Sequence, residues 1–278
     1  MSAPAAIALV VHHASPERTR RCLESLCAQD LEALRVILVD HSEAGGGARL
    51  VDGLAHARCL RPPANRGFAA GVNAGLAAGD APAVLLLNPD AVAEPSWARR
   101  MVEALSGGER MGMVACRVLG RDGRLDSAGL AVSRGGMGIL RGHRRRAQTP
   151  VTRLDAMPLL GPTGAAAAYR RQALVAIGGF PEDYFLYYED LEVAWRLRAL
   201  GWSCAWLDEA LVLHDHISGA GAAKRGHLRR SRRLFRERNF PQERAPRRGG
   251  AAAKDPVSME PLLVPTRRWL ADMVRRAL

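Results

Sequence analysis

The sequence predicts an α/β fold built on a mostly parallel central sheet, and three observations favour it. Short apolar runs such as residues 7–11 (IALVV) and 35–39 (RVILV) are typical of buried strands. Stretches with helical spacing of apolar residues separate these runs, and parallel strands need such crossover connections. The chain has 278 residues, enough to bury the core of one large α/β domain.

The first half of the chain alternates strands with helices. Leu23, Leu26 and Cys27 recur at helical spacing, whereas residues 83–87 (AVLLL) form an apolar run of strand length. In chain order, we expect strand 7–11, helix 17–28, strand 35–39, a short strand near 56–60, helix 71–78, strand 83–87 and helix 97–105.

The second half is less regular. Residues 106–160 are rich in Gly and Arg, which predicts a mixture of loops and strands. A second ordered block follows, with expected helices at 170–177 and 189–200 and a strand at 210–213. We therefore expect one domain over residues 1–240, a linker over 241–264, and an amphipathic helix over 265–278.

Composition excludes several classes of protein. No apolar run approaches the roughly 20 residues that a membrane span requires. The amino-terminal segment lacks a basic-then-apolar export signal, so we expect the protein in the cytoplasm. The five cysteines are scattered and have no CxxC spacing, which predicts reduced thiols rather than a disulfide framework or a zinc site.

The formal net charge of +12 suggests an anionic partner: nucleic acid, a membrane surface or a small anionic ligand. Only Lys224 and Lys254 are lysines, so arginine carries nearly all of the positive charge, as codon usage in a GC-rich genome alone would produce. An arginine-rich nucleic-acid-binding protein would interleave basic with aromatic residues, but aromatic residues make up only 5% of the chain. We therefore expect no nucleic-acid partner.

Polar side chains follow three of the predicted strands. His12 comes after the first strand, Asp40 after the second, and Asp90 closes the turn Asn-Pro-Asp after the strand at 83–87. Such residues are common in turns, but ligands of open parallel sheets bind beyond the carboxyl ends of the strands. Three polar residues in equivalent places favour a binding site there.

The stretch NRGFAAGVNAG, residues 65–75, is a second candidate for ligand binding. Its glycines Gly67 and Gly71 allow close approach of the backbone, while Asn65, Arg66 and Asn73 can donate hydrogen bonds to an anion. It is neither a Walker A loop nor a GxGxxG fingerprint. A glycine-rich loop before a helix is weak support for a phosphate site.

Four motifs together resemble the inverting family 2 glycosyltransferases, especially the bacterial rhamnosyltransferase-like branch. The resemblance covers residues 5–240, with the motifs in the family's order. They are NRGFAAGVNAG (65–75), LLLNPD (85–90), GGFPEDYFLYYEDLEVAWRLRALGW (178–202) and LVLHDH (211–216).

The resemblance implies a GT-A fold, in which a nucleotide-binding half and an acceptor-binding half share one sheet. It implies that Asp90 binds a divalent cation, Mg²⁺ or Mn²⁺, that bridges to the donor diphosphate, and that Asn88 replaces the first acid of the family's DxD-type motif. His214 would be the second protein ligand of the cation, with His216 as a rival. The residues implied on the donor side are His12, Asp40, Asn65, Arg66, Gly67, Asn73, Asn88 and Asp90.

Asp190 matches the position of the family's catalytic base, and Glu189 precedes it. Two acids at a helix start can also interact favourably with the helix dipole alone. The match to the family motif is what favours Asp190 as the base. Trp195 and Arg196 are implied on the acceptor side.

The implied reaction moves a sugar from a nucleotide-diphosphate donor to an acceptor hydroxyl with inversion, and the expected donor is dTDP-rhamnose. The acceptor would be a lipid-linked glycan in cell-surface polysaccharide assembly, which places the enzyme peripherally at the inner face of the membrane. The alternatives are the nucleic-acid binder above and a nucleotidyltransferase of related fold, although IALVVHHASPE lacks the latter's glycine-rich basic loop.

The sequence departs from the family pattern at several positions. His12 and His13 stand where an Asn-Tyr pair is usual, and His41 stands in place of an Asn. Glu192 replaces the second Asp of the EDxD pattern, and Pro181 replaces the Asp of GGFDE. These departures concern base and acceptor recognition more than catalysis.

Overall fold

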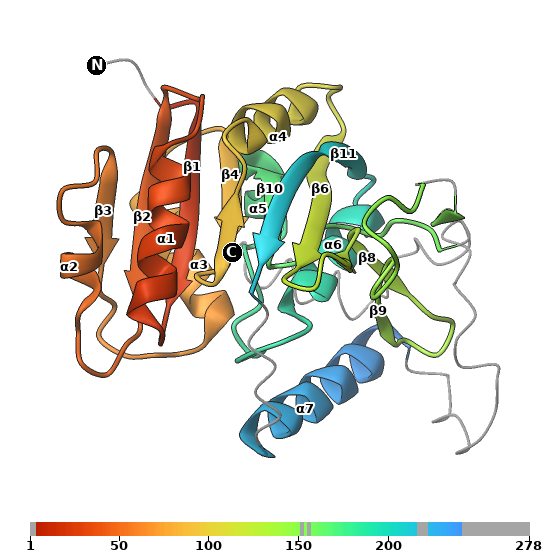
Figure 1. The fold of residues 1–278 in the computed structure, drawn as a ribbon. Helices are drawn as coiled ribbons and strands as arrows, with labels where there is room; N and C mark the ends of the chain where they lie inside the picture. The colour runs from red at the N-terminus through yellow and green to blue at the C-terminus, as the bar shows by residue number, and fades with distance from the viewer. Residues whose placement is uncertain (1–3, 151–152, 155–156, 216–221, 241–278) are drawn as a thin grey trace.

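The computed structural model describes residues 4–150, 153–154, 157–215 and 222–240 (Figure 1). The linker expected at 241–264 and the helix expected at 265–278 lie outside these ranges, as does His216. The described helices are α1 (Pro16–Cys27), α2 (Gly47–Val51), α3 (Phe68–Ala78), α4 (Trp97–Leu105), α5 (Arg171–Ala176), α6 (Glu189–Ala199) and α7 (Ala222–Asn239).

The strands form one large sheet and one small one. The large sheet has the order β3-β2-β1-β4-β10-β6-β11-β5, with β7 paired to β6, and β8 pairs with β9 separately. Their bounds are β1 (Ala6–His12), β2 (Leu34–Asp40), β3 (Ala57–Leu60), β4 (Ala83–Leu87), β5 (Ala91–Ala93), β6 (Met111–Gly120), β7 (Leu125–Ser127), β8 (Leu130–Val132), β9 (Gly138–Leu140), β10 (Ala166–Arg170) and β11 (Ser203–His214).

The expected parallel sheet is confirmed, with reversed strands at defined places. β3, β2, β1 and β4 pair in parallel, as do β6 and β11. β10 runs antiparallel between β4 and β6, and the short β5 runs antiparallel to β11. Because β10 is reversed, the loop that enters it lies at the edge where β4 ends. The architecture is α/β with a mixed, mostly parallel sheet.

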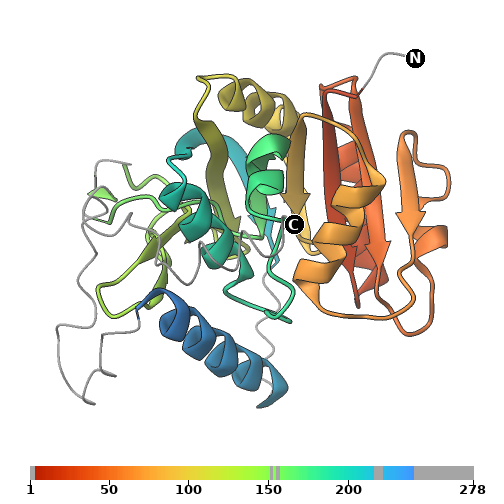
Figure 2. The same ribbon diagram turned by 180° about the vertical axis from the view of Figure 1, so that it is seen from behind.

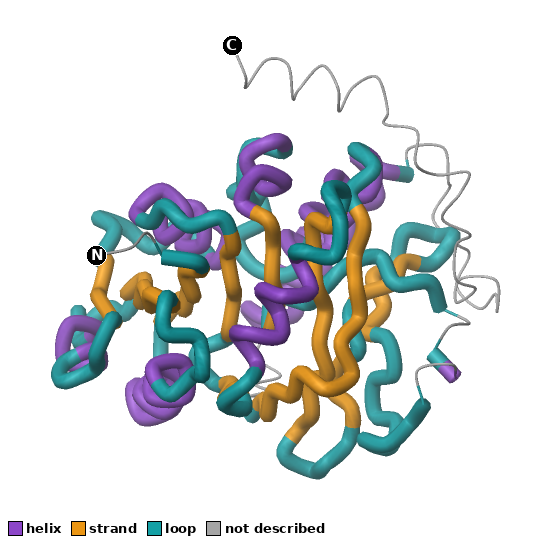
Figure 3. Tube along the Cα trace, turned by 90° about the horizontal axis from the view of Figure 1, so that it is seen from above, coloured by secondary structure: helices purple, strands orange, loops and turns teal. Residues whose placement is uncertain are grey.

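Helices cover both faces of the sheet (Figures 1, 2 and 3). Alternate side chains of a strand point to opposite faces, so Ile7 and Leu9 of β1 join a core with α3, α5 and α6. Ala8 and Val10 join a second core with α1 and α4. Burial on both faces explains why the strands appear in the sequence as continuous apolar runs.

The glycines of α3 serve packing on the sheet. A Cβ at Gly71 would come within 2.8 Å of Val11, and one at Gly75 within 2.9 Å of Leu9. The helix backbone therefore lies directly on β1. The close approach expected of Gly71 is an approach to the sheet.

The expected elements of the first half agree with the structure to within a few residues, but several later elements differ. β11 spans Ser203–His214 rather than 210–213, because its first half is only partly buried and carries mixed side chains. β6 to β9 lie in the region 106–160, which was expected as loops and strands without defined bounds, whereas β5, β10 and α7 were not expected. The arginine-rich α7 has only Ser231 and Phe235 buried, so its sequence lacks an apolar stripe. No described helix is long and apolar enough to cross a membrane.

Gly67 offers a test of the packing that joins the two halves of the chain. It has φ +96°, and a Cβ there would lie 2.3 Å from the carbonyl oxygen of Phe185. Gly67→Ala should therefore lower the free energy of unfolding by about 2 kcal/mol or more. The check is urea denaturation beside Gly46→Ala, whose Cβ would meet nothing within 4 Å. Equal effects of the two substitutions would contradict this account.

Candidate active site

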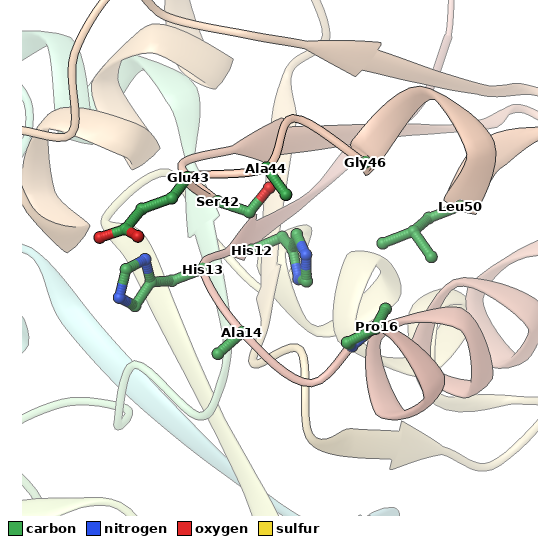
Figure 4. Close-up of a pocket in the computed structure, with 9 residues that line it drawn as sticks. All are labelled: His12, His13, Ala14, Pro16, Ser42, Glu43, Ala44, Gly46 and Leu50. Carbon is green, nitrogen blue, oxygen red and sulfur yellow. The ribbon is translucent and has the colours of Figure 1, made fainter.

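A pocket of about 460 Å³ opens at the carboxyl ends of β1 and β2. Its walls come from the end of β1, the start of α1 and the loop between β2 and α2 (Figure 4). This is the edge where the sequence predicts a binding site. The lining residues are His12, His13, Ala14, Pro16, Ser42, Glu43, Ala44, Gly46 and Leu50.

His12 and His13 line this pocket, and the backbone of His41 contacts both of them. The N–H of His41 donates to the carbonyl of His12 at 2.7 Å, and Nδ1 of His13 lies 3.3 Å from the carbonyl oxygen of His41. Burial lowers the pKa of His12 and of His41, although the nearby Asp40 opposes the shift. Both rings are therefore neutral at neutral pH, and each can donate and accept a hydrogen bond.

Asp40 holds the loop that forms one wall of the pocket. Its Oδ1 accepts hydrogen bonds from the N–H of Ser42 at 2.9 Å and from the Ser42 hydroxyl at 2.6 Å. Its Oδ2 accepts from the N–H of Gly47 at 2.9 Å and from Arg61 at 3.0 Å. Burial by itself would raise the pKa of Asp40, but these hydrogen bonds together lower it below the ordinary value. Contact of Asp40 with a donor stays a prediction.

His214, the last residue of β11, lies between two carboxylates. Its Nδ1 is 2.8 Å from Oδ2 of Asp126, and its Nε2 is 3.2 Å from Oδ1 of Asp90. The amide nitrogen of Asn88 lies 3.5 Å from the same Nε2. Burial alone would lower the pKa of His214, but the hydrogen bonds with Asp126 and Asp90 outweigh it and raise the pKa to about 9.

The pair of Asp90 and His214 fits a divalent cation that is shared with a ligand. The contact of Nδ1 with Asp126 directs Nε2 of His214 at Asp90, as a carboxylate does for a metal-binding histidine. Across the described ranges, no group of three or more His, Cys, Asp or Glu side chains is arranged to hold a metal ion. Two protein ligands suffice where a diphosphate and water supply the others.

The sequence did not predict Asp126 as a site residue. It lies on β7, inside the Gly- and Arg-rich region expected as loops and strands. Nothing in its local sequence distinguishes it from other acids, because its partner His214 lies 88 positions away.

Contacts of Asp215 hold the end of β11 next to the Asn-Pro-Asp turn. Its N–H donates to the carbonyl of Asp90 at 2.9 Å. Its carboxylate pairs with Arg21 of α1 at 2.8 Å and with Arg121 at 2.9 Å. These contacts keep the preceding histidine close to Asp90.

The NRGF loop contacts a later segment of the chain. Oδ1 of Asn65 accepts from the N–H of Gly67 at 2.9 Å, which fixes the turn before α3. Arg66 is mostly exposed, and its guanidinium lies 2.9 Å from the carboxylate of Glu182. The N–H of Phe68 donates to the carbonyl of Phe185 at 2.9 Å.

Asn73 makes the same connection from within α3. Its amide nitrogen donates to the carbonyl of Phe180 at 2.8 Å and to Glu182 at 3.0 Å. Its amide oxygen accepts from the N–H of Phe180 at 2.8 Å. The loop and helix therefore hold the GGFPED segment in place, and donor binding by Asn73 stays a prediction.

Glu189 and Asp190 begin α6 as a pair with unequal surroundings. Asp190 is half-buried and accepts from the N–H of Gly164 at 2.8 Å and of Leu191 at 2.7 Å. Glu189 is buried, and its Oε2 has no hydrogen-bond partner within the described part of the chain. Burial raises the pKa of both groups, and the charge of Asp190 raises that of Glu189 further. Asp190 is therefore the member that carries the negative charge.

One loop joins Asp190 to the Asn-Pro-Asp turn. Gly164 donates to Asp190, and the carbonyl of the next residue, Ala165, accepts from the N–H of Asn88 at 2.9 Å. The ring of Phe68 also lies against Gly164. The sequence reading did not select Gly164 or Ala165, because main-chain contacts leave no residue-type signal.

Trp195 and Arg196 are occupied in packing. The Trp195 ring packs against Phe235 at 6.0 Å and Phe240 at 5.2 Å between ring centroids. Nε of Arg196 donates to the buried Glu192 at 2.8 Å. The structure gives both residues a role between α6 and α7, and their contact with an acceptor stays a prediction.

The family model described as Glycosyl transferase family 2 matches residues 7–178, which include the pocket, the Asn-Pro-Asp turn and the loop before β10. The chain belongs to glycosyl transferase family 2. This membership decides among the functions expected from the sequence in favour of the glycosyltransferase.

Curated relatives of the chain include a rhamnosyltransferase and an O-antigen biosynthesis protein. The N-acetylglucosaminyl-diphospho-decaprenol L-rhamnosyltransferase of Mycobacterium tuberculosis is 28% identical over 230 residues, covering 75% of this chain and 75% of that protein. The O-antigen biosynthesis protein RfbC of Myxococcus xanthus is 28% identical over 153 residues, or 50% of this chain. That match spans only 11% of RfbC.

Solved structures show the same GT-A fold. A mannosyltransferase from Pyrobaculum calidifontis, in complex with GDP-Man and Mn²⁺, matches with a TM-score of 0.64 and 18% identity. The match covers 88% of this chain and 66% of that one. GalNAc-T7 with UDP, GalNAc and Mn²⁺ matches with a TM-score of 0.66 and 13% identity, over 86% of this chain and 49% of its own.

Asp40 predicts a pH-dependent contribution to stability. Because its pKa is lowered in the folded protein, its contribution is complete above the unfolded aspartate pKa and is lost as the pH falls through the folded value. Asp40→Asn should cost about 1–3 kcal/mol at neutral pH. The free energy of unfolding, measured by urea denaturation, should differ less between the native and variant proteins in acid than at neutral pH. A difference independent of pH would contradict this role.

Proposed function

We propose that this family 2 enzyme transfers L-rhamnose from a nucleoside-diphosphate donor, dTDP-rhamnose being the first choice, to a hydroxyl of a lipid-linked glycan, with inversion. The observation that carries the proposal is the connection of Asp190 to the Asn88 turn through Gly164 and Ala165. It brings the residue proposed as the base to the same edge of the sheet as the turn that carries the proposed cation ligand Asp90.

The donor would lie along the carboxyl ends of β1, β2 and β4. The base and ribose would occupy the pocket beside the neutral ring of His12, and the diphosphate would extend toward the Asn88–Asp90 turn. The residues proposed on this side are His12, Asp40, Asn65, Arg66, Gly67, Asn73, Asn88 and Asp90.

Asp90 and His214 would hold a divalent cation, Mg²⁺ or Mn²⁺, which offsets the negative charge of the departing diphosphate. The two solved structures described above contain Mn²⁺ with a nucleotide or nucleotide sugar, which supports this assignment. Asp126 would keep the imidazole of His214 in the orientation that a ligand needs.

Asp190 would act as the general base. It would take the proton of the acceptor hydroxyl as that oxygen forms a bond to the anomeric carbon. The bond from that carbon to the donor phosphate breaks on the opposite face, and its electron pair leaves with the nucleoside diphosphate. Attack from the opposite face inverts the anomeric configuration. The two N–H donors to Asp190 hold its carboxylate ready for this role.

The choice of sugar and acceptor rests on the relatives. The name of the Mycobacterium tuberculosis protein specifies L-rhamnose transfer to a diphospho-decaprenol glycan, and RfbC is named for O-antigen biosynthesis. A lipid-linked acceptor would place the enzyme peripherally on the inner face of the cell membrane, in assembly of the cell wall or a surface polysaccharide.

Cation dependence tests Asp90 and His214. Binding of nucleotide sugars, measured by thermal shift across a panel of donors, should weaken with EDTA and recover with Mn²⁺ or Mg²⁺. Asp90→Asn should lose this dependence, and Asp126→Ala should weaken cation-dependent binding by about 10- to 100-fold. Asp80→Asn, at an exposed position before β4, is the matched control. If Asp90→Asn binds the nucleotide sugar tightly and EDTA does not change this binding, Asp90 is only a turn residue.

Substitution of the base should separate binding from chemistry. Asp190→Asn keeps the shape of the side chain but cannot take a proton, so donor binding should persist while sugar transfer falls by about 10²- to 10⁴-fold. Glu189→Gln should have a milder effect, because burial and the charge of Asp190 raise the pKa of Glu189 and favour its protonated form. The measurement is transfer of labelled sugar to a soluble acceptor analogue. An inactive Glu189→Gln beside an active Asp190→Asn would move the base to Glu189.

A further inference from the structure

Helix α7 has an inner face that packs on the segment carrying the candidate base. Phe235 is buried among aromatic rings, and the hydroxyl of Ser231 donates to the carbonyl of Leu186 at 2.9 Å. Asn239 donates to Glu192 of α6 at 2.7 Å, and His227 stacks on Phe185. The helix is thereby fixed in orientation relative to α6.

The outer face of α7 is a row of arginines. Arg225, Arg229, Arg232 and Arg233 are exposed and are spaced at i, i+4, i+7 and i+8, which places them on one side of the helix. At 1.5 Å per residue this row is roughly 12 Å long.

Acidic side chains within α7 are too few to balance its arginines. The helix holds one acid, Glu237, against seven arginines and Lys224. Ion pairs engage Arg233 and Arg238, whereas Arg229 and Arg232 have no carboxylate partner among the residues that the structure describes. Like charges at i and i+4 destabilise a helix, so an anionic partner outside the chain would stabilise this face.

We propose that the arginine row of α7 docks on the anionic phospholipid surface of a membrane. Guanidinium groups bind phosphates through paired hydrogen bonds, and a straight row of them matches a flat layer of lipid phosphates. The inference deepens the proposed function and rests on it for the lipid-linked acceptor. It specifies which face of the enzyme meets the lipid.

The orientation of α7 would place the candidate site at the membrane. α7 lies at the end of the molecule toward which β4 and β11 run, the same end as the candidate site (Figures 1 and 2). Its inner face packs on residues 183–192, which include Asp190. Docking through the outer face therefore holds the acceptor side of the site near the membrane surface.

The same row is a poor match for single-stranded nucleic acid. Such sites stack bases on exposed aromatic rings between the basic residues. The aromatic side chains of α7 point inward, with His227 on Phe185 and Phe235 buried, while the large apolar side chain exposed beside the arginines is Leu228.

The test uses the full chain and sedimentation with phosphatidylcholine vesicles, with and without phosphatidylglycerol. The native protein should bind only the anionic vesicles, and salt should weaken binding. The double variant Arg229→Glu, Arg232→Glu should bind the anionic vesicles at least about tenfold more weakly than the native protein. A control pair, Arg49→Glu with Arg110→Glu, changes the net charge equally at exposed positions away from α7 and should keep native binding.

The proposal would be overturned if both double variants lost vesicle binding equally, or if the α7 variant still bound anionic vesicles like the native protein. Tighter binding of an oligonucleotide than of vesicles, lost in the same α7 variant, would overturn it in favour of nucleic acid. Thermal melting of each variant verifies folding. Transfer to a soluble acceptor analogue, without vesicles, should be native in the α7 variant. If the native chain transfers no sugar but still binds anionic vesicles through α7, the proposed function fails and the docking face stands.

Discussion

The geometry of the site depends on the short loop that enters β10. Gly164 donates to Asp190, and Ala165 accepts from Asn88, so two adjacent residues fasten the start of α6 to the turn after β4. The loop reaches that edge because β10 runs antiparallel between β4 and β6. A parallel strand in that place would enter the sheet from the opposite edge. The reversed direction of β10 thus brings the proposed base and cation ligands together.

The segment before α6 is held in an unfavourable backbone conformation. Tyr187 and Tyr188 have φ of 69° and 71°, in the left-handed region that non-glycine residues avoid. Such residues cost of order 1–3 kcal/mol each and persist where surrounding contacts compensate. Here the hydroxyl of Tyr188 accepts from the N–H of Gly138 at 3.1 Å, and Lys224 lies over the ring of Tyr187. The position of Asp190 therefore depends on the small sheet and on α7 as well as on α6.

Glu192 explains why one departure from the family pattern is accommodated. The side chain is fully buried, and it accepts from Tyr184 at 3.1 Å, Arg196 at 2.8 Å and Asn239 at 2.7 Å. A buried carboxylate is tolerated when its oxygens are paired in this way. The extra methylene relative to Asp gives the carboxylate reach to Asn239 at the end of α7. The departure therefore belongs to the packing of the two helices.

The sequence alone determined the fold class, the polar residues at the carboxyl ends of β1, β2 and β4, and the family resemblance. These depend on local patterns: apolar runs of strand length, helical spacing, and motifs such as LLLNPD. It also predicted Asp90, Asp190 and His214 as site residues, and their surroundings in the structure suit those proposed roles. Local order is sufficient to predict the fold class because strand and helix periodicity lies in consecutive residues. The site residues were implied by the motifs that resemble the family.

Only the tertiary structure decided which side chains meet. It supplied Asp126 as the partner of His214, 88 positions away, and the main-chain contacts of Gly164 and Ala165. It also showed that Asn73 joins α3 to Phe180, and it identified α7, whose helix lacks an apolar stripe and depends on packing against the 183–192 segment. Contacts between distant residues depend on the order and direction of the strands. No local pattern records that β10 is reversed, so the meeting of these residues follows from the sheet.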